Sequence, residues 1–277
     1  MSNKKTNFVI SRIVMYVILI VFLVFFLFPI IWLAITSVKP QAETMSPTLP
    51  SRLTMASYVE TFTRYSFAKY FPNSVIVSLL STLLVAIVAV PGAYGFAKYK
   101  YKGCRTLFMG CVLLRMVPFI ALMVPLYIYL SNLGLINTKT ALVIANMTFN
   151  LPLSLWIMES YFREFPNELI EAASIDGSGR VGTLIKIVAP ISLPSISTVV
   201  ILTFLTTWKE FLFAFISSAS DESKTITVGI AALTQDYGIR WDLMSAAGTV
   251  CILPVLIIAI CFQKYIIAGM TVGAVKG

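Results

Sequence analysis

Long apolar runs alternate with short polar segments along the whole of this 277-residue chain. Six of these runs are long enough to cross a bilayer, for which a helix needs about 20 residues. They predict helices over Ile13–Ile35, Pro72–Ala97, Leu107–Leu130, Ala141–Tyr161, Ile191–Ser217 and Ser245–Ile267. The pattern therefore predicts an all-α integral membrane protein with six transmembrane helices.

The first run raises an alternative, because basic residues precede it as in a secretory signal peptide: Lys4, Lys5 and Arg12. A signal peptide has an apolar core of only about 7–15 residues, followed by a cleavage site of small residues. The run Ile13–Ile35 is longer, and no such cleavage site follows it. We interpret it as a retained transmembrane helix.

Composition agrees with a membrane protein and removes several classes of function. Hydrophobic residues make up 58% of the chain and charged residues 12%, well below the charged share of soluble domains. The net charge of +9 is spread between the apolar runs rather than along one face, so we expect no nucleic-acid partner. Histidine is absent and no two of the four cysteines form a C-x-x-C pair, so we expect no metal site.

Basic residues also predict the orientation. With the N-terminus inside, twelve of the 21 Lys and Arg residues lie in inner segments and seven in outer ones. The remaining two, Arg115 and Lys209, lie within the membrane, while Lys264 near the end of the last run is counted as inner. The densest cluster, KYKYKGCR after the second run, is then inside, as the positive-inside rule requires. Both termini and the loop after the fourth run are predicted to be cytoplasmic.

Prolines interrupt several of the runs, among them Pro118 and Pro125 in the third. Membrane helices tolerate proline when neighbouring groups satisfy the freed carbonyls, which is one interpretation. The other is that these two residues loosen the third helix around a transport pathway.

The loop after the fourth run is unusual in being acidic, with four carboxylates within thirteen residues: Glu164, Glu168, Glu171 and Asp176. Pro166 suits a first helical turn, and Gly177 suits a left-handed helix end, so a short helix is predicted over Glu164–Ile175. Such a helix is marginal alone in water and needs a packing partner. Its expected close-packing face consists of Leu169, Ala172 and Ala173.

A second short helix is predicted over Arg180–Ala189, ended by Pro190. Its apolar stripe is Val181, Leu184, Ile185 and Val188. The loop could be an amphipathic segment on lipid headgroups, but such helices are usually basic because the cytoplasmic leaflet is anionic. The acidic first half therefore favours a protein partner with basic residues.

This loop resembles the EAA loop of permease subunits in binding-protein-dependent ABC importers. It has Glu171-Ala172-Ala173, then Gly177 at the usual offset, then Ile187-Val188-Ala189-Pro190, with Ala189 where leucine is usual. FPIIWLAITSVK, NSVIVSLLSTL, VPLYIYLSNLGLINTKTALV, WKEF and the ending GMTVGAVKG resemble the smaller of two maltose-type permease subunits. The resemblance covers nearly the whole chain.

The resemblance implies a type I ABC importer permease (MetI-like) fold in a bacterial inner or cytoplasmic membrane. It implies an N-terminal helix and first extracellular loop over 1–69, a permease domain over 70–267 and a cytoplasmic tail over 268–277. The implied partners are a second homologous permease subunit forming a heterodimer, two cytoplasmic ABC ATPase subunits and an extracellular sugar-binding protein. The implied cargo is a sugar or oligosaccharide.

The resemblance also assigns residues to the contact with the ATPase: Glu171, Ala172, Ala173, Asp176, Gly177, Ile187 and Pro190. The tail Gly273–Gly277 is implied to lie near the ATPase dimer. No G-x-x-x-x-G-K-[ST] phosphate loop occurs in the chain, so ATP and its Mg²⁺ are expected on the separate ATPase. The chain itself is expected to be no enzyme and to hold no cofactor.

Charged and aromatic residues within the runs are candidates for the substrate pathway: Arg115, Tyr127, Tyr129, Trp208, Lys209, Glu210 and Phe211. A charge near the bilayer midplane is costly unless it is paired or hydrated, which makes Arg115 a functional candidate. One hypothesis is that Arg115 and Lys209 face an anionic sugar. The other is that Arg115 pairs with a carboxylate of the second permease while Lys209 extends to the interface.

Three other functions are possible on the sequence alone. The EAA loop is shared by importers of amino acids, peptides and phosphate, although the sugar-branch motifs argue against these. A membrane-embedded enzyme is the second, but this chain has no histidine and no paired intramembrane carboxylates to serve as catalytic groups. An ion-coupled carrier is the third, but this chain does not have the acidic residues that usually relay ions at the helix centres of such carriers.

Overall fold

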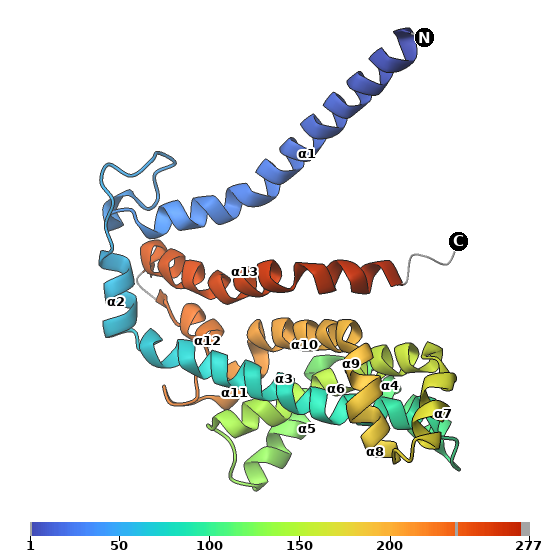
Figure 1. The fold of residues 1–277 in the computed structure, drawn as a ribbon. Coiled ribbons are helices and arrows are strands. Elements are labelled where there is room, and N and C mark those ends of the chain that lie inside the picture. Colours follow the sequence, from blue (N-terminus) through green and yellow to red (C-terminus); the bar gives the residue numbers. More distant parts are fainter. Residues whose placement is uncertain (1, 236–237, 273–277) are drawn as a thin grey trace. The chain divides into compact units, whose positions relative to one another are not determined.

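A computed structural model describes the backbone of residues 2–235 and 238–272, and it is almost entirely helical (Figure 1). The chain divides into two compact units. The first comprises Met1–Phe67 and Ile230–Ile252, and the second comprises Ala68–Gly229 and Leu253–Gly277. The expected tail Gly273–Gly277 lies outside the described residues.

The first unit begins with α1 (Ser2–Ser37), whose side chains from Ile13 to Phe28 are all exposed and almost all apolar. A long helix that is apolar on every side is stable only where lipid surrounds it. It is followed by the 3₁₀ turn η1 (Gln41–Glu43) and by α2 (Ala56–Arg64). Lys39, between α1 and η1, is buried; its Nζ donates to the carbonyl of Ser46 at 2.8 Å and lies 4.6 Å from the centre of the Trp32 ring.

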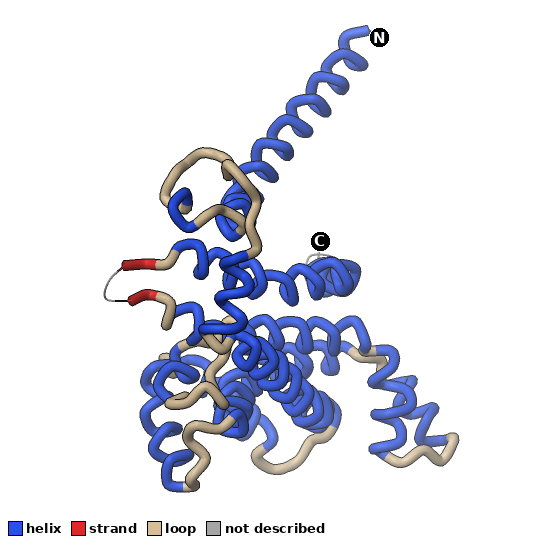
Figure 2. The backbone as a smooth tube through the Cα atoms, turned by 90° about the vertical axis from the view of Figure 1, so that its left-hand side faces the viewer, coloured by secondary structure: helices blue, strands red, loops and turns tan. Residues whose placement is uncertain are grey.

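The rest of the first unit is a small hairpin and the start of the last helix. Strands β1 (Thr234–Gln235) and β2 (Gly238–Ile239) pair antiparallel (Figure 2), so the all-α prediction misses one short hairpin. Helix α13 (Trp241–Val272) follows. Arg240 joins its first turn to α2, with Nη2 lying 2.8 Å from Asp242 and 3.0 Å from Glu60.

The second unit is built around α6 (Lys139–Glu164), the most deeply buried of the long helices. It packs against α4 (Cys104–Leu113), α5 (Phe119–Asn132), α10 (Leu193–Trp208) and α11 (Leu212–Ser217). Helix α3 (Phe67–Lys98) adds its buried side chains to the same core. The remaining elements are η2 (Leu114–Met116), α7 (Asn167–Ile175), α8 (Arg180–Thr183), the π turn η3 (Leu184–Val188), α9 (Ala189–Ile191) and α12 (Ile226–Ala231).

Two apolar clusters form the core of this unit. One contains α3, the second half of α6 and the loop α7–α9, including Phe162, Leu184 and Val188. The other contains α5, the first half of α6, α11 and α12, including Leu142 and Phe213. Helices α7 and α8 therefore lie at one end of the unit and α11 and α12 at the other (Figure 1).

Four of the six predicted spans are single long helices, and two are bent. The third prediction, Leu107–Leu130, is wrong in being continuous. Cys104–Met116 and Phe119–Asn132 meet at 105°, because Pro118 removes a backbone donor and the chain becomes extended at Val117. The break is therefore at Pro118, while Pro125 lies inside α5.

The fifth prediction, Ile191–Ser217, also differs from the structure. The helix α10 covers only Leu193–Trp208, about 24 Å of helix, and meets the segment Arg180–Ile191 at 81°. Residues 209–211 are not helical, and α11 begins at Leu212. Lys209 and Glu210 thus lie in a break between two helices rather than within one.

Candidate functional site

The acidic loop is an ordered helix–turn–helix. Helix α7 begins at Asn167, three residues after the predicted start, because Pro166 occupies the N-cap. It ends as predicted at a left-handed Gly177 with φ +79°. The N–H of Gly177 donates to the carbonyl of Ser174 at 3.1 Å, and the N–H of Ser178 donates to Ala173 at 2.9 Å. These bonds close the helix end and direct the chain into α8.

Two cationic side chains attach this loop to the end of α3. The Lys98 Nζ donates to the carbonyl of Phe165 at 2.6 Å and to Asn167 Oδ1 at 2.7 Å. The guanidinium of Arg180 lies 4.7 Å from the centre of the Tyr99 ring. The loop is thus bound to α3 at its first residues and again at the start of α8.

The outer face of the loop is apolar. Ile175 is 86% exposed, and Leu169, Val181 and Ile185 are exposed as well. The predicted stripe on the second helix is therefore divided, since Leu184 and Val188 join the core while Val181 and Ile185 do not. An ordered surface with this much exposed apolar area is typical of a docking site.

The seven predicted contact residues are distributed over this surface unevenly. Glu171, Ala172, Asp176, Gly177 and Pro190 are exposed, and Ile187 is half-buried. Ala173 is only 2% exposed and packs inward. The predicted face of Leu169, Ala172 and Ala173 is thus only partly correct, because Ala173 alone is buried.

The prediction that Pro190 ends the second helix is wrong. Helical structure runs from Arg180 through the π turn to Ile191, and Pro190 lies within α9. The N–H of Ala189 donates to the carbonyl of Leu184, five residues earlier. This wider turn immediately before Pro190 accommodates its ring, which an ordinary α-turn does not.

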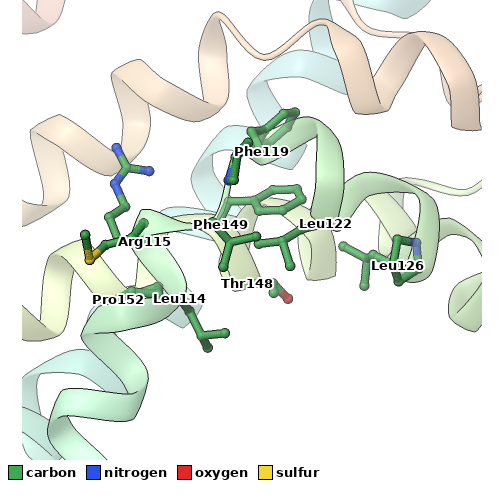
Figure 3. Close-up of a pocket in the computed structure, with 12 residues that line it drawn as sticks. Leu114, Arg115, Phe119, Leu122, Leu126, Thr148, Phe149 and Pro152 are labelled. Carbon is green, nitrogen blue, oxygen red and sulfur yellow. The ribbon is translucent and has the colours of Figure 1, made fainter.

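A pocket of about 440 Å³ lies where the third span is broken (Figure 3). Arg115 lines one end of it, while Phe119 and Phe149 pack together with ring centroids 4.2 Å apart. Arg115 is exposed, and it makes no hydrogen bond or ion pair with any other residue that the structure describes. The remaining lining is largely apolar: Leu114, Met116, Val117, Pro118, Leu122, Pro125, Leu126, Thr148 and Pro152.

None of the other predicted pathway residues lines this pocket. Trp208 is 3% exposed and packs against Phe204 and Phe71, with ring centroids 5.7 and 5.9 Å apart. The Glu210 carboxylate accepts the backbone N–H groups of Phe213 at 2.7 Å and Ala214 at 3.1 Å. Both side chains therefore have structural partners in this chain.

The other predicted pathway residues are more accessible. Lys209 is exposed at the end of α10, and Phe211 packs on Phe215 with centroids 5.3 Å apart. Tyr127 is half-buried beside the second apolar cluster, and Tyr129 is exposed on α5. The structure thus does not bring the candidates together in one site.

Two asparagines that the sequence gives no reason to single out hold the loop between α11 and α12. Asn137, itself left-handed with φ +64°, accepts through Oδ1 from the N–H of Ser220 at 2.9 Å and from Ser223 Oγ at 2.7 Å. Asn73 Nδ2 donates to the carbonyls of Glu222 at 3.1 Å and Lys224 at 3.0 Å. The loop Ser218–Thr225 is therefore rigidly positioned.

An ion pair flanks the same loop. Lys69 Nζ lies 2.6 Å from Glu222 Oε1, and this hydrogen bond holds the pKa of Glu222 below its usual range. Tyr70 OH donates to Asp221 Oδ1 at 2.7 Å. This end of the second unit is polar and charged, in contrast to the apolar face of α7 and α8.

The sequence and the fold of this chain are both similar to those of known transport proteins. Residues 89–272 match the family described as the binding-protein-dependent transport system inner membrane component. The chain is 34% identical over 273 residues to the trehalose/maltose transport system permease protein MalG of Thermococcus litoralis, covering 97% of this chain and 98% of that one. It is 31% identical to the arabinooligosaccharides transport system permease protein AraQ of Bacillus subtilis, with both chains fully covered.

The fold matches a chain of a bacterial ABC transporter involved in the import of the acidic polysaccharide alginate, with a TM-score of 0.77. The two are 23% identical, and the match covers 92% of this chain and 96% of that one. The likeness shows a shared importer-permease fold.

Proposed function

Because this chain belongs to the family of binding-protein-dependent transport system inner membrane components, we propose that it is the permease subunit of an ATP-driven sugar importer. Its relatives include permeases named for trehalose or maltose and for arabinooligosaccharides, with the match covering nearly all of each chain. These names support a sugar or oligosaccharide as the cargo. The protein is thereby an integral component of a bacterial inner or cytoplasmic membrane, which agrees with its four long apolar helices and two bent pairs.

The energy for transport comes from another protein in this proposal. The sequence has no phosphate-binding loop, so two separate ABC ATPase subunits bind ATP and Mg²⁺ and hydrolyse the nucleotide. A second, homologous permease completes the pore, and an extracellular binding protein delivers the sugar. A structure similar to this chain is described as an alginate transporter in complex with its pentasaccharide-bound periplasmic protein, which supports the last of these partners.

The observation that carries the proposal is the ordered loop α7–α8 with its exposed apolar face. Leu169, Ile175, Val181 and Ile185 project from a helix pair whose own core contacts are already satisfied by other residues. A free-standing apolar surface of this kind needs a partner, and the acidic side chains around it favour a basic one. We assign the ATPase to this surface, with the loop on the cytoplasmic side as the distribution of basic residues predicts.

Movement of the ATPase would pass into the membrane through the contacts between this loop and α3. Lys98 holds the first turn of α7, and Arg180 holds α8 through the Tyr99 ring. Leu184 and Val188 insert into the cluster formed by α3 and α6. The loop and the inner ends of these helices therefore move together as one body, as rigid-body switching requires.

Among the predicted pathway residues, Arg115 lines the pocket at the break in the third span. Its unpaired charge beside a broken helix suits contact with a hydroxyl-rich or anionic sugar, or with a carboxylate of the second permease. Lys209, Phe211, Tyr127 and Tyr129 remain accessible and are assigned to the pathway with it.

The proposal is tested by changing Gly177 to proline. Gly177→Pro is incompatible with φ +79° and removes the N–H that bonds Ser174, so α7 loses its defined end. Gly179→Pro is the matched control, because φ is −72° there and suits proline. In proteoliposomes containing the whole transporter, we expect Gly177→Pro to abolish sugar uptake while basal ATP hydrolysis persists. A fully active Gly177→Pro transporter would contradict the docking role.

A further inference from the structure

A second pocket, of about 530 Å³, lies beside the basic segment KYKYKGCR and shares no lining residue with the Arg115 pocket. Residues of three elements line it: the end of α3, the start of α4 and the end of α6. Its volume is within the range of small-ligand sites. The lining residues include three cations (Lys100, Arg105 and Arg163) and one carboxylate (Glu159).

The charge of this pocket is not balanced from within. The buried Glu159 carboxylate is already engaged by Arg163, whose Nη2 and Nε lie 2.5 and 3.2 Å from Oε1. Lys100 and Arg105 are exposed, and neither makes a hydrogen bond or ion pair with another residue in the described part of the chain. Two cations therefore face the pocket without a counter-charge.

Beside the charged groups, the pocket has aromatic and apolar walls. Phe96 contacts Phe108 with ring centroids 5.5 Å apart and Tyr101 at 6.5 Å. On the adjoining surface of α4, Leu107 and Met109 are exposed to the surroundings. A soluble anion would gain little from such walls, whereas a ligand with both an anionic group and a hydrocarbon chain would use both parts.

The pocket also lies at a particular depth. The apolar spans of α3 and α6 end at Lys98 and Glu164, next to the lining residues, and the third span begins with α4 at Cys104. The pocket is therefore at the level of the lipid headgroups. The density of basic residues in this segment places it on the cytoplasmic side, where the leaflet is anionic.

We propose that this pocket binds the phosphate headgroup of an anionic phospholipid of the inner leaflet, with Lys100 and Arg105 contacting the phosphate and Phe96, Tyr101 and Phe108 contacting the acyl chain. This inference requires that the chain lies in a membrane with the segment KYKYKGCR on the cytoplasmic side, and it stands or falls separately from the coupling role of α7 and α8. A free phosphate compound is the competing source of the same chemistry.

Native mass spectrometry of the whole transporter, titrated with phosphatidylglycerol, tests the proposal. Lys100→Gln with Arg105→Gln removes both free cations, and Lys102→Gln removes one charge from the same segment at an exposed position that does not line the pocket. At about fivefold per cation at a membrane surface, we expect the double variant to bind about 25-fold more weakly. We expect Lys102→Gln to bind like the unaltered protein, and the charge-conserving pair Lys100→Arg with Arg105→Lys to retain binding.

Four further outcomes decide among the alternatives. Phosphatidylcholine should bind poorly, and equal binding of the two lipids would overturn the proposal. Inorganic phosphate or glycerol phosphate binding as well as the lipid would show a soluble-anion site instead. Equal loss in Lys102→Gln and the double variant would show diffuse attraction rather than a pocket. Lipid bound to the isolated chain but not to the whole transporter would mean that a partner subunit covers the site, which also overturns it.

Discussion

The attachment of the loop α7–α8 to α3 makes a quantitative prediction for Lys98→Met. The methionine retains most of the length of the side chain but loses both hydrogen bonds, to the Phe165 carbonyl at 2.6 Å and to Asn167 Oδ1 at 2.7 Å. A hydrogen bond from a charged donor contributes about 1.5–3 kcal/mol, and the lower figure applies because Lys98 is only half-buried. The two bonds together stabilise the attached loop by about 3 kcal/mol, a factor of about 100 in the ratio of attached to released loop.

The consequence is a loss of coupling rather than of folding. We expect Lys98→Met to lower sugar uptake per ATP hydrolysed by about tenfold or more, while basal hydrolysis changes by less than about twofold, because the ATPase itself is unaltered. The assay is parallel measurement of uptake and hydrolysis in proteoliposomes with the binding protein and sugar supplied. Asn167→Ala removes one bond of the two and should have a smaller effect.

Two control variants separate the loss of the attachment from the loss of a positive charge. Lys102→Met removes the same charge at an exposed position four residues away, and it should leave the ratio of uptake to hydrolysis unchanged. Lys98→Arg restores a cationic donor and should recover part of the coupling. An unchanged ratio of uptake to hydrolysis in Lys98→Met would mean that the attachment does not transmit the movement of the ATPase. An equal fall of this ratio in Lys102→Met would mean the same.

Three further predictions concern the pathway and the opposite end of the second unit. Asn137→Ala removes the acceptor for the loop Ser218–Thr225 and should lower the free energy of unfolding by about 2 kcal/mol and Tm by about 4–8 °C. Asn137→Asp retains an acceptor and should lower both by less. Thermal unfolding in detergent measures the difference. Glu210→Ala should destabilise α11 by about 1 kcal/mol without changing the relative uptake rates of different sugars. A change in these relative rates would mean that Glu210 contacts the sugar. Arg115→Gln and Lys209→Asn should reduce uptake of an acidic oligosaccharide more than that of its neutral counterpart, and equal loss of both substrates would exclude an anionic cargo.

The sequence predicted those structural features that are determined by residues close together in the chain. Apolar runs of sufficient length located the four long helices and the two bent helix pairs of the described residues, because the bilayer requires such runs regardless of tertiary packing. The left-handed end of α7 followed from Gly177, and a loosened third span followed from Pro118. In each case a single residue type restricts the backbone directly.

Features that depend on distant packing were not predictable in the same way. Lys98 and Asn167 are 69 positions apart, and no pattern in either segment indicates that they meet. The break at residues 209–211 has apolar helix on both sides, so hydropathy alone reads it as continuous. Trp208 was a candidate for the substrate pathway, but its ring is buried against Phe204 and Phe71. Only the fold decides which aromatic rings remain accessible.

The central claim is that the loop α7–α8 binds the cytoplasmic ATPase, and site-specific cross-linking from position 175 tests it most directly. Ile175 is 86% exposed on that loop, so a photo-cross-linking amino acid placed there should be tolerated and should reach any docked partner. Leu133 is exposed at the C-cap of α5, which the distribution of basic residues predicts to be on the extracellular side, and it provides the matched control. In membranes holding the whole transporter, the account predicts a cross-link from position 175 to the ATPase and none from position 133. Cross-links from position 175 only to lipid or to the extracellular binding protein would contradict it.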